Sequence, residues 1–340
     1  MHHLSILSCF LLVSRVIAIQ STKILAARAS PSSYPGGDGD ACTNEFKYLN
    51  FDVSDETQKG HAQAAHRAFC IGWLDLTVSG AQNVDDTDRA VFQRFFEDTE
   101  NSKTKIGQVY SALVNKTSCV AQPIIANMIL DNIDFLDACD SDGKASTITG
   151  AYWGFDTADK LEKFHICDAA YHFPDIPSDM YCGYLSDHPS IAMESLASTI
   201  LHETLHFTSV GTPIFNRRIR DKQNQDGIRA YCPQRTHGLV DPRQDNANGK
   251  SAKLANTNAD SYAWHATNSY YKYACSNVGE PGPNNGNYND PPAYTRGQGC
   301  DADSDVIGMW RVLILAVADQ RNLYDLDTCR ISTHSNDVSI

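Results

Sequence analysis

The stretch His202-Glu203-Thr204-Leu205-His206 constrains the fold more than any other part of this chain. In a helix, side chains four residues apart lie on one face with Cβ atoms ~6 Å apart. That spacing lets both imidazoles reach one ion at Zn–N distances of ~2.0 Å. Glu203 lies beside the pair, where sites of this type place a general base. We therefore expect a helix here, with His202 and His206 as metal ligands.

The residues around this motif have the periodicity of an amphipathic helix. Ser195 and Thr199 continue the face that carries the two histidines. Ser190, directly after Pro189, is the predicted N-cap. An ordinary helix with two surface histidines is the alternative. The apolar stripe on the other face comprises Met193, Leu196, Ala197, Ile200, Leu201 and Leu205.

Two histidines do not complete a catalytic zinc site, which needs three protein ligands and one open position. The extended motif with Gly three and His six residues after the second histidine is excluded, because Ser209 and Thr212 occupy those positions. A Glu from a downstream helix is disfavoured, because the only later Glu, Glu280, lies in turn sequence. An Asp ligand remains.

Asp260 is the candidate for this ligand. It lies in the first turn of a second predicted helix, for which Asn258 is the expected cap. A carboxylate in this position has another explanation, because it interacts with the helix dipole by ~0.3–1 kcal/mol. Spacing alone leaves both readings open. The helical spacing rests on Tyr262, Ala263, Ala266, Tyr270, Tyr273 and Ala274.

The His-Glu-x-x-His motif followed by Asn258-Ala259-Asp260-Ser261-Tyr262 resembles the aspzincins, the deuterolysin-type fungal metalloendopeptidases that include lysine-specific members. The likeness also touches Ile166-Cys167 and Tyr171-His172-Phe173 and covers about residues 110 to 275. It implies an α+β, zincin-like metallopeptidase domain with a small mixed sheet, an active-site helix and disulfides.

The same resemblance implies roles for individual residues. Zn²⁺ would be held by His202, His206 and, as third ligand, Asp260, while Glu203 would be the catalytic general base. The chain would then be a secreted zinc endopeptidase of the aspzincin type, acting on protein or peptide substrates through zinc-activated water.

The family's Gly-Thr-x-x-Asp and Ala-Tyr-Gly segments are less well matched. Gly211-Thr212 occurs, but no Asp follows until Asp221. Ala230-Tyr231-Cys232 is the nearest match to Ala-Tyr-Gly. Tyr231 is therefore the predicted catalytic donor to the oxyanion, and a structural tyrosine is the alternative.

The beginning of the chain and its cysteines predict export. Residues 1–18 have the features of a signal peptide, with an apolar run too short to span a bilayer. Residues 19–41 are rich in Ser, Pro and Gly and are expected to be a flexible lead-in. Of the 11 cysteines, Cys9 lies in the signal, which leaves an even number without Cys-x-x-Cys pairs. This pattern predicts a secreted, extracellular protein with up to five disulfides.

Residues 42–340 are predicted to form a single catalytic domain with a helical N-terminal part, a core at about 110–275, and a C-terminal loop and helix. The helical part spans 55–115, with helices at 62–76, from Asp85 or Asp86, and at 103–114. The segment 211–257 lacks a clear period and is a candidate substrate-binding loop. Short strands are expected at 128–130, 147–153 and 164–173, a loop at 276–302 and a buried helix at 306–318.

The formal net charge of −13 argues against nucleic acid or an anionic membrane as a partner. We expect a monomer that binds peptide substrates. One rival function is a secreted zinc-binding, zinc-scavenging or adhesion protein with a zincin-like fold and no catalysis. Related fungal zinc scavengers typically replace the motif glutamate, so the presence of Glu203 favours the enzyme. Hydrolysis of non-peptide amides at the same site is a further alternative.

Overall fold

The part of the chain that the computed structural model describes has both helices and a sheet, which confirms the α+β class. The predicted signal peptide, nearly all of the lead-in, the loop beyond residue 277 and the helix at 306–318 lie outside that part. No described helix is long and apolar enough to cross a membrane. The described residues are 34–35, 42–87, 89–139, 150–157, 159–179, 182, 185, 189, 193–223, 229–240 and 254–277.

The main sheet is small and mixed, as predicted, with strand order β1-β4-β6-β5. β1 pairs with β4 and β4 with β6 in parallel, whereas β5 and β6 are antiparallel. A separate hairpin joins β2 (Val114–Asn115) to β3 (Val120–Ala121). The strands of the main sheet are β1 (Lys47–Leu49), β4 (Ile129–Asp131), β5 (Ala151–Asp156) and β6 (Leu161–Ile166).

The strand predicted at 128–130 is confirmed as β4, but the one predicted at 164–173 is wrong at its end. β6 ends at Ile166, and a 3₁₀ helix, Asp168–His172, follows. Between them Cys167 is joined to Cys139 by a disulfide, and its N–H donates to the Gly150 carbonyl at 2.8 Å. These ties hold Cys167 where the chain leaves the sheet.

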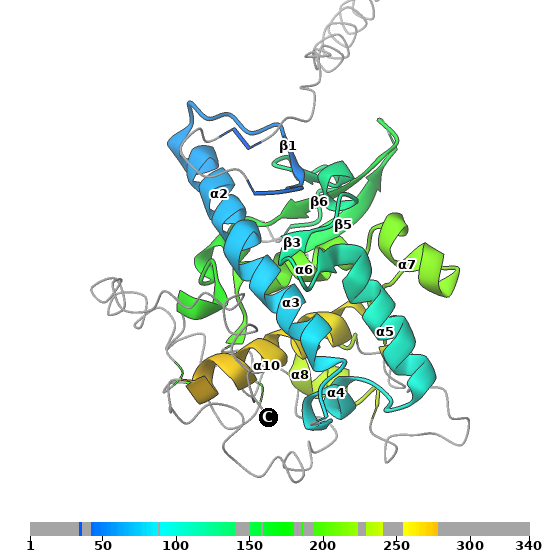
Figure 1. Ribbon diagram of the computed structural model, residues 1–340. Helices are drawn as coiled ribbons and strands as arrows, with labels where there is room; N and C mark the ends of the chain where they lie inside the picture. Colours follow the sequence, from blue (N-terminus) through cyan, green and yellow to red (C-terminus); the bar gives the residue numbers. More distant parts are fainter. Residues whose placement is uncertain are drawn as a thin grey trace, which may run out of the picture.

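A long helical rod crosses beside the sheet (Figure 1). It consists of α2 (Glu56–Arg67), a π-helical segment (Ala68–Trp73) and α3 (Leu74–Asn83), one directly after the other. Asp55 caps the rod by accepting from the N–H groups of Thr57 and Gln58. The predicted apolar stripe is buried along its whole length and comprises Ala62, Ala65, Phe69, Trp73 and Leu76.

The next two helices confirm the predicted elements but move their boundaries. α4 is Ala90–Phe95, not a helix from Asp85 or Asp86. α5 is Glu100–Leu113, and it begins before the predicted residue 103 because Thr99 caps it by accepting from the N–H of Ser102.

The motif helix, α6 (Leu196–Leu205), begins later than predicted. Ser195 is its N-cap, and the side chains of Ser195 and Ser198 each accept from the other's backbone N–H. This reciprocal capping satisfies two N–H groups that the first turn leaves free, so the prediction of Ser190 as the cap is wrong. The predicted apolar stripe of α6 is buried, which confirms its orientation.

The segment 211–257, predicted to be one irregular loop, contains helices in its described part. α7 (Thr208–Phe215) follows the motif helix, and α8 (Cys232–His237) comes after Tyr231. Arg220 forms a parallel bridge with Asn258, which ties the segment to the start of the last helix. The prediction missed α8 because six residues are too few to establish a period.

The last described helix, α10 (Ala259–Asn277), packs against α3, α4, α6 and α8 and is buried on nearly every side. Its buried polar groups have partners. His265 Nδ1 lies 2.8 Å from Tyr110 Oη, and Nε2 lies 3.0 Å from Asn83 Oδ1. Burial lowers the pKa of His265 to about 3, so the ring is neutral. Trp73, fully buried, donates to Thr204 Oγ1 at 3.1 Å and so ties the rod to α6.

Three disulfides join described residues: Cys42–Cys70, Cys139–Cys167 and Cys182–Cys275. Cys119 and Cys232 are disulfide-bonded as well, so every described cysteine is paired. The predicted disulfide framework is confirmed for this part of the chain. Such a framework is typical of proteins that fold in an oxidising compartment.

Gly72 is required where the rod meets α6. A Cβ atom there would lie 2.6 Å from Ala197 Cβ and 3.0 Å from Pro177 Cδ. We expect Gly72→Ala to lower the free energy of unfolding by about 1–3 kcal/mol, because overpacking would push α6 away from the rod. Urea denaturation of the purified protein measures this change.

Gly60→Ala is the matched control, because a Cβ atom at Gly60 in α2 would have no neighbour within 4 Å. Ala is favoured over Gly in a helix by about 0.5–1 kcal/mol, so this variant should be slightly more stable than wild type. Equal stability of the two variants would contradict the close packing of Gly72 against α6.

Candidate metal centre

The two motif histidines line a cavity of about 1230 Å³. His202 lies in the last turn of α6, and His206 is its C-cap. Thr199, one turn earlier on the same face, lines the cavity too, as the polar stripe in the sequence predicted. Trp153 of β5 lines the cavity as well, with its ring centre 6.3 Å from that of His206. The cavity is therefore built between the motif helix and the antiparallel edge of the sheet.

The inner nitrogens of the two imidazoles converge. His202 Nε2 and His206 Nε2 are 3.1 Å apart. Asp221 Oδ1 lies 3.1 Å from the first and 3.3 Å from the second. Nitrogen or oxygen ligands at ~2.0 Å from a tetrahedral ion are ~3.3 Å from one another. These three atoms are therefore spaced as three ligands of one metal ion.

The outer nitrogens of the same rings are held by hydrogen bonds. His202 Nδ1 lies 2.7 Å from Asp260 Oδ1, and His206 Nδ1 lies 3.1 Å from the Ile219 carbonyl oxygen. A carboxylate or carbonyl oxygen accepts, so each Nδ1 carries a proton and each Nε2 faces inward, where it offers a lone pair to a metal ion when it is unprotonated. Metal-binding histidines are oriented in this way by their outer partners.

Two buried oxygen atoms at this point have no hydrogen-bond partner, namely Asp221 Oδ1 and Glu203 Oε2. Buried acceptors without a donor are costly unless a cation satisfies them. Two lone pairs from the histidines and one from Asp221 meet in the same small volume. The donor set, two imidazoles and a carboxylate, suits Zn²⁺. The residues therefore fit the metal that the sequence predicted.

The electrostatics also favour a positive charge at this point. Burial lowers the pKa of His202, but Asp260 and Asp221 outweigh burial and raise that pKa well above its usual value. Burial raises the pKa of Asp221, but His202 and His206 outweigh it and hold the pKa well below its usual range. A proton on His202 supplies the charge when no metal does, so metal and proton compete for Nε2.

Asp260, predicted as the third ligand, lies on the outer side of His202, where its Oδ1 contacts Nδ1. Asp221 lies on the inner side and approaches both Nε2 atoms. This geometry favours Asp221 as the ligand and Asp260 as the group that orients His202. Sequence reasoning passed over Asp221 because it does not stand at the family's offset from Gly211-Thr212.

Glu203 and Tyr231 both lie at the site, as predicted. Glu203 is buried, with Oε1 3.9 Å from His202 Nε2, and burial raises its pKa. Tyr231 Oη donates to Asp221 Oδ2 at 3.1 Å and itself accepts from the Arg229 guanidinium at 2.6 Å. Burial and the Asp221 charge raise the pKa of Tyr231 to about 12, so it remains a hydroxyl at neutral pH.

The cavity contains another acidic residue that the sequence did not single out. Glu194 lies just before the cap of α6 and lines the same cavity. Burial, followed by repulsion from Asp260, raises its pKa to about 7. No local spacing in the sequence marks Glu194, because its environment comes from α10.

Comparison with known proteins assigns the chain to no family. No protein-family model matches it, and no curated protein matches it. The resemblance to the aspzincins therefore rests on the motif residues alone and stays a prediction.

Two substitutions separate the roles of Asp221 and Asp260. Asp221→Asn should lower zinc affinity by more than about a hundredfold, because a ligand is lost. Asp260→Asn should lower it by only about 10- to 100-fold, the usual effect of an outer partner. Competition with a chromophoric chelator measures both affinities. The reverse order of the two effects would restore Asp260 as the ligand.

Glu194 makes stability depend on pH in the metal-free protein. Its pKa rises from 4.5 to about 7 on folding, so folding favours the protonated form. Protonated Glu194 therefore contributes up to about 3 kcal/mol to the free energy of unfolding. This contribution is fully present below pH 4.5 and is lost as the pH rises through 7. Urea unfolding of chelator-treated protein should show this loss in wild type and a smaller one in Glu194→Gln. Identical pH profiles would contradict the assignment.

Proposed function

We propose that the protein is a secreted zinc-dependent endopeptidase in which His202, His206 and Asp221 hold the metal. The observation that carries the proposal is the convergence of both Nε2 atoms and Asp221 Oδ1 within 3.3 Å of one another. The open cavity around them supports a metal that is reached by substrate. A buried, closed site would support a structural metal instead.

When bound, zinc polarises a carbonyl oxygen and lowers the pKa of a water molecule towards ~7. Glu203 accepts the proton of the attacking water and passes it to the leaving amine. Its raised pKa suits both steps, because a group that takes and returns a proton works best with a pKa near the operating pH.

The other residues of the site position these groups. Asp260 and the Ile219 carbonyl hold the imidazoles with their Nε2 atoms inward. Tyr231 holds Asp221 by donating to Oδ2, and Arg229 holds Tyr231. In this proposal Tyr231 turns its hydroxyl to the substrate oxyanion only if it releases Asp221, so its predicted catalytic role requires that movement.

A peptide is the substrate class that the cavity favours. Its volume of about 1230 Å³ exceeds the ~300–1,000 Å³ typical of small-molecule pockets. Apolar and cationic groups line it side by side, and Arg218 lies 4.3 Å from the centre of the Trp153 ring. The large volume and the mixed lining both suit an extended peptide with side chains of several kinds. The rival, a zinc-binding or adhesion protein without catalysis, is favoured by no contact at the site.

Glu203→Gln separates the enzyme from the binder. The substitution removes the charge and leaves the volume almost unchanged, so fold and zinc content should persist. Loss of the general base should lower the rate of casein cleavage by about 10²–10⁴-fold. The assay compares both proteins at equal zinc content, with a chelator and zinc add-back as controls.

Two outcomes would contradict the proposal in different ways. Equal cleavage by wild type and Glu203→Gln that a chelator does not inhibit would remove Glu203 and the metal from the reaction. A zinc-loaded wild type that cleaves no protein substrate would favour the zinc-binding protein instead.

A further inference from the structure

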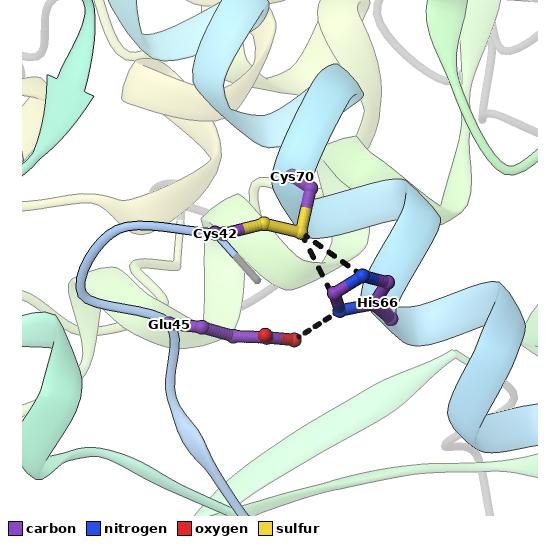
Figure 2. Close-up of side chains that lie close together, drawn as sticks. All are labelled: Cys42, Glu45, His66 and Cys70. Atoms are coloured by element: carbon purple, nitrogen blue, oxygen red, sulfur yellow. Dashed lines mark hydrogen bonds and ion pairs between the residues drawn. A yellow bond between two sulfur atoms is a disulfide. The ribbon is translucent and has the colours of Figure 1, made fainter. Parts of the chain in front are cut away.

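A second cluster of metal-binding side chains lies far along the chain from the motif helix. Cys42, Glu45, His66 and Cys70 each offer a ligand atom, and these atoms all lie within 4.8 Å of one another. Figure 2 shows that the first two come from the loop before β1 and the other two from the helical rod. In this state the two cysteines form a disulfide.

The spacing of the four residues is that of a zinc site. Cys42 and Glu45 are three apart in a loop, and His66 and Cys70 are four apart on one helical face. Structural zinc sites typically combine one pair of ligands with about 2–4 residues between them and a second pair with about 3–5 residues between them. The loop and the rod bring both pairs to one point.

One distance fits a tetrahedral ion directly, because His66 Nδ1 lies 3.5 Å from Cys70 Sγ. His66 Nδ1 and Glu45 Oε1 are at hydrogen-bond distance, 2.8 Å, and would separate to ~3.3 Å around an ion. With Zn–S of 2.3 Å and Zn–N of 2.0 Å, sulfur and nitrogen ligands are ~3.5 Å apart. Two thiolates on one zinc are ~3.8 Å apart. The Cα atoms of Cys42 and Cys70 are separated by 5.5 Å, so rotation of the side chains supplies that distance.

Glu45 accepts a hydrogen bond from the Tyr48 hydroxyl and contacts His66 Nδ1 at 2.8 Å. Only 9% of its side chain is exposed, and among described residues its ion-pair partner is His66, with no Lys or Arg. The nearby Arg67 instead pairs with Asp175 and Asp179. A buried carboxylate is costly without a positive charge close to it. Tyr34 stacks on the His66 ring, with centroids 4.0 Å apart, and holds it against Glu45.

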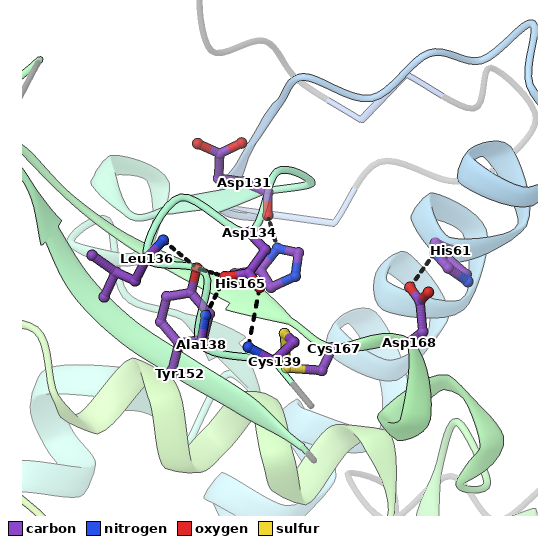
Figure 3. The surroundings of a disulfide bond; sticks show 10 residues. All are labelled: His61, Asp131, Asp134, Leu136, Ala138, Cys139, Tyr152, His165, Cys167 and Asp168. Atoms are coloured by element: carbon purple, nitrogen blue, oxygen red, sulfur yellow. Dashed lines mark hydrogen bonds and ion pairs between the residues drawn. A yellow bond between two sulfur atoms is a disulfide. The ribbon is translucent and has the colours of Figure 1, made fainter. Parts of the chain in front are cut away.

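The Cys139–Cys167 disulfide provides a comparison within the same molecule. His165 lies beside it, but its Nδ1 contacts the Asp131 carbonyl oxygen at 2.8 Å, and among the described residues no carboxylate joins the group as a fourth ligand (Figure 3). Nearby Asp134 is occupied by the backbone N–H groups of Ala138 and Cys139 and by the Tyr152 hydroxyl. A histidine beside a disulfide therefore does not by itself make a complete donor set.

We propose that Cys42, Glu45, His66 and Cys70 form a second, redox-gated zinc site. A dithiol reductant transfers two electrons and two protons to the disulfide and is itself oxidised to a disulfide. Zinc then binds the two sulfurs, His66 and Glu45, and the two thiol protons are released. A disulfide oxidant reverses the process: it takes two electrons from the two thiolates and, with two protons, is reduced to two thiols, while the Cys42–Cys70 disulfide re-forms and the metal is released. A cavity of about 490 Å³ lined by Cys42, His66 and Cys70 supplies an entry path.

Cobalt titration of the full-length chain tests this site without reference to any enzymatic activity. Reduced wild type should bind about one more equivalent of Co²⁺ than oxidised protein, with a sulfur-to-cobalt charge-transfer band. The proposed ligands of the motif-helix site, His202, His206 and Asp221, contain no sulfur. Cys232 lines that cavity and is retained in the Cys42→Ser/Cys70→Ser variant, so loss of the band there assigns the band to the second site. The band should disappear in Cys42→Ser/Cys70→Ser and persist in the matched control Cys139→Ser/Cys167→Ser. An unchanged band in the first variant would overturn the proposal.

Alkylation of reduced wild type provides a test that needs no variant to fold. Zinc should slow modification of Cys42 and Cys70 by at least about tenfold and leave Cys139 and Cys167 unchanged. Peptide mapping by mass spectrometry gives the rate at each cysteine. Equal protection of all four, no protection, or unfolding of the reduced chain with zinc present would each show that the pair serves only as a disulfide.

Discussion

The hydrogen bond between His202 Nδ1 and Asp260 Oδ1 is the interaction on which the candidate metal centre depends. It joins α6 to the first turn of α10, through two residues that are 58 positions apart in the sequence. It also decides which nitrogen of His202 faces the cavity. Because α10 also packs against α3, α4 and α8, the orientation of a single ring is fixed by the packing of most of the helical core.

The fold was predictable where one period extends over many residues. The stripe from Ala62 to Leu76, the apolar face of α6 and the helix from Ala259 all follow the pattern in the sequence. Boundaries were less predictable because capping decides them. Ser190 and Ser195 are equally good caps by residue type, and only the reciprocal bonds with Ser198 select Ser195. The end of β6 depends on a disulfide partner that local sequence does not reveal.

The candidate site was likewise predictable from the sequence only in part. His202, Glu203 and His206 follow from fixed offsets on one helix, and the structure brings all three together. Asp221 and Asp260 lie in the same cavity, but which of them faces the inner nitrogens depends on how the chain returns after α7. Glu194 and the Cys42–Glu45–His66–Cys70 cluster are products of tertiary packing, so no single-segment pattern marks them.

The Cys182–Cys275 disulfide has a consequence for damage to the chain. It closes a covalent loop that contains both motif histidines, Asp221 and Asp260. A single break of the backbone anywhere inside that loop, including at Arg217-Arg218, would leave two polypeptides still linked through sulfur. The halves of the metal centre would stay at high effective concentration, so they could rejoin as an intramolecular event. A protein of this build can persist in a nicked, two-chain form without falling apart.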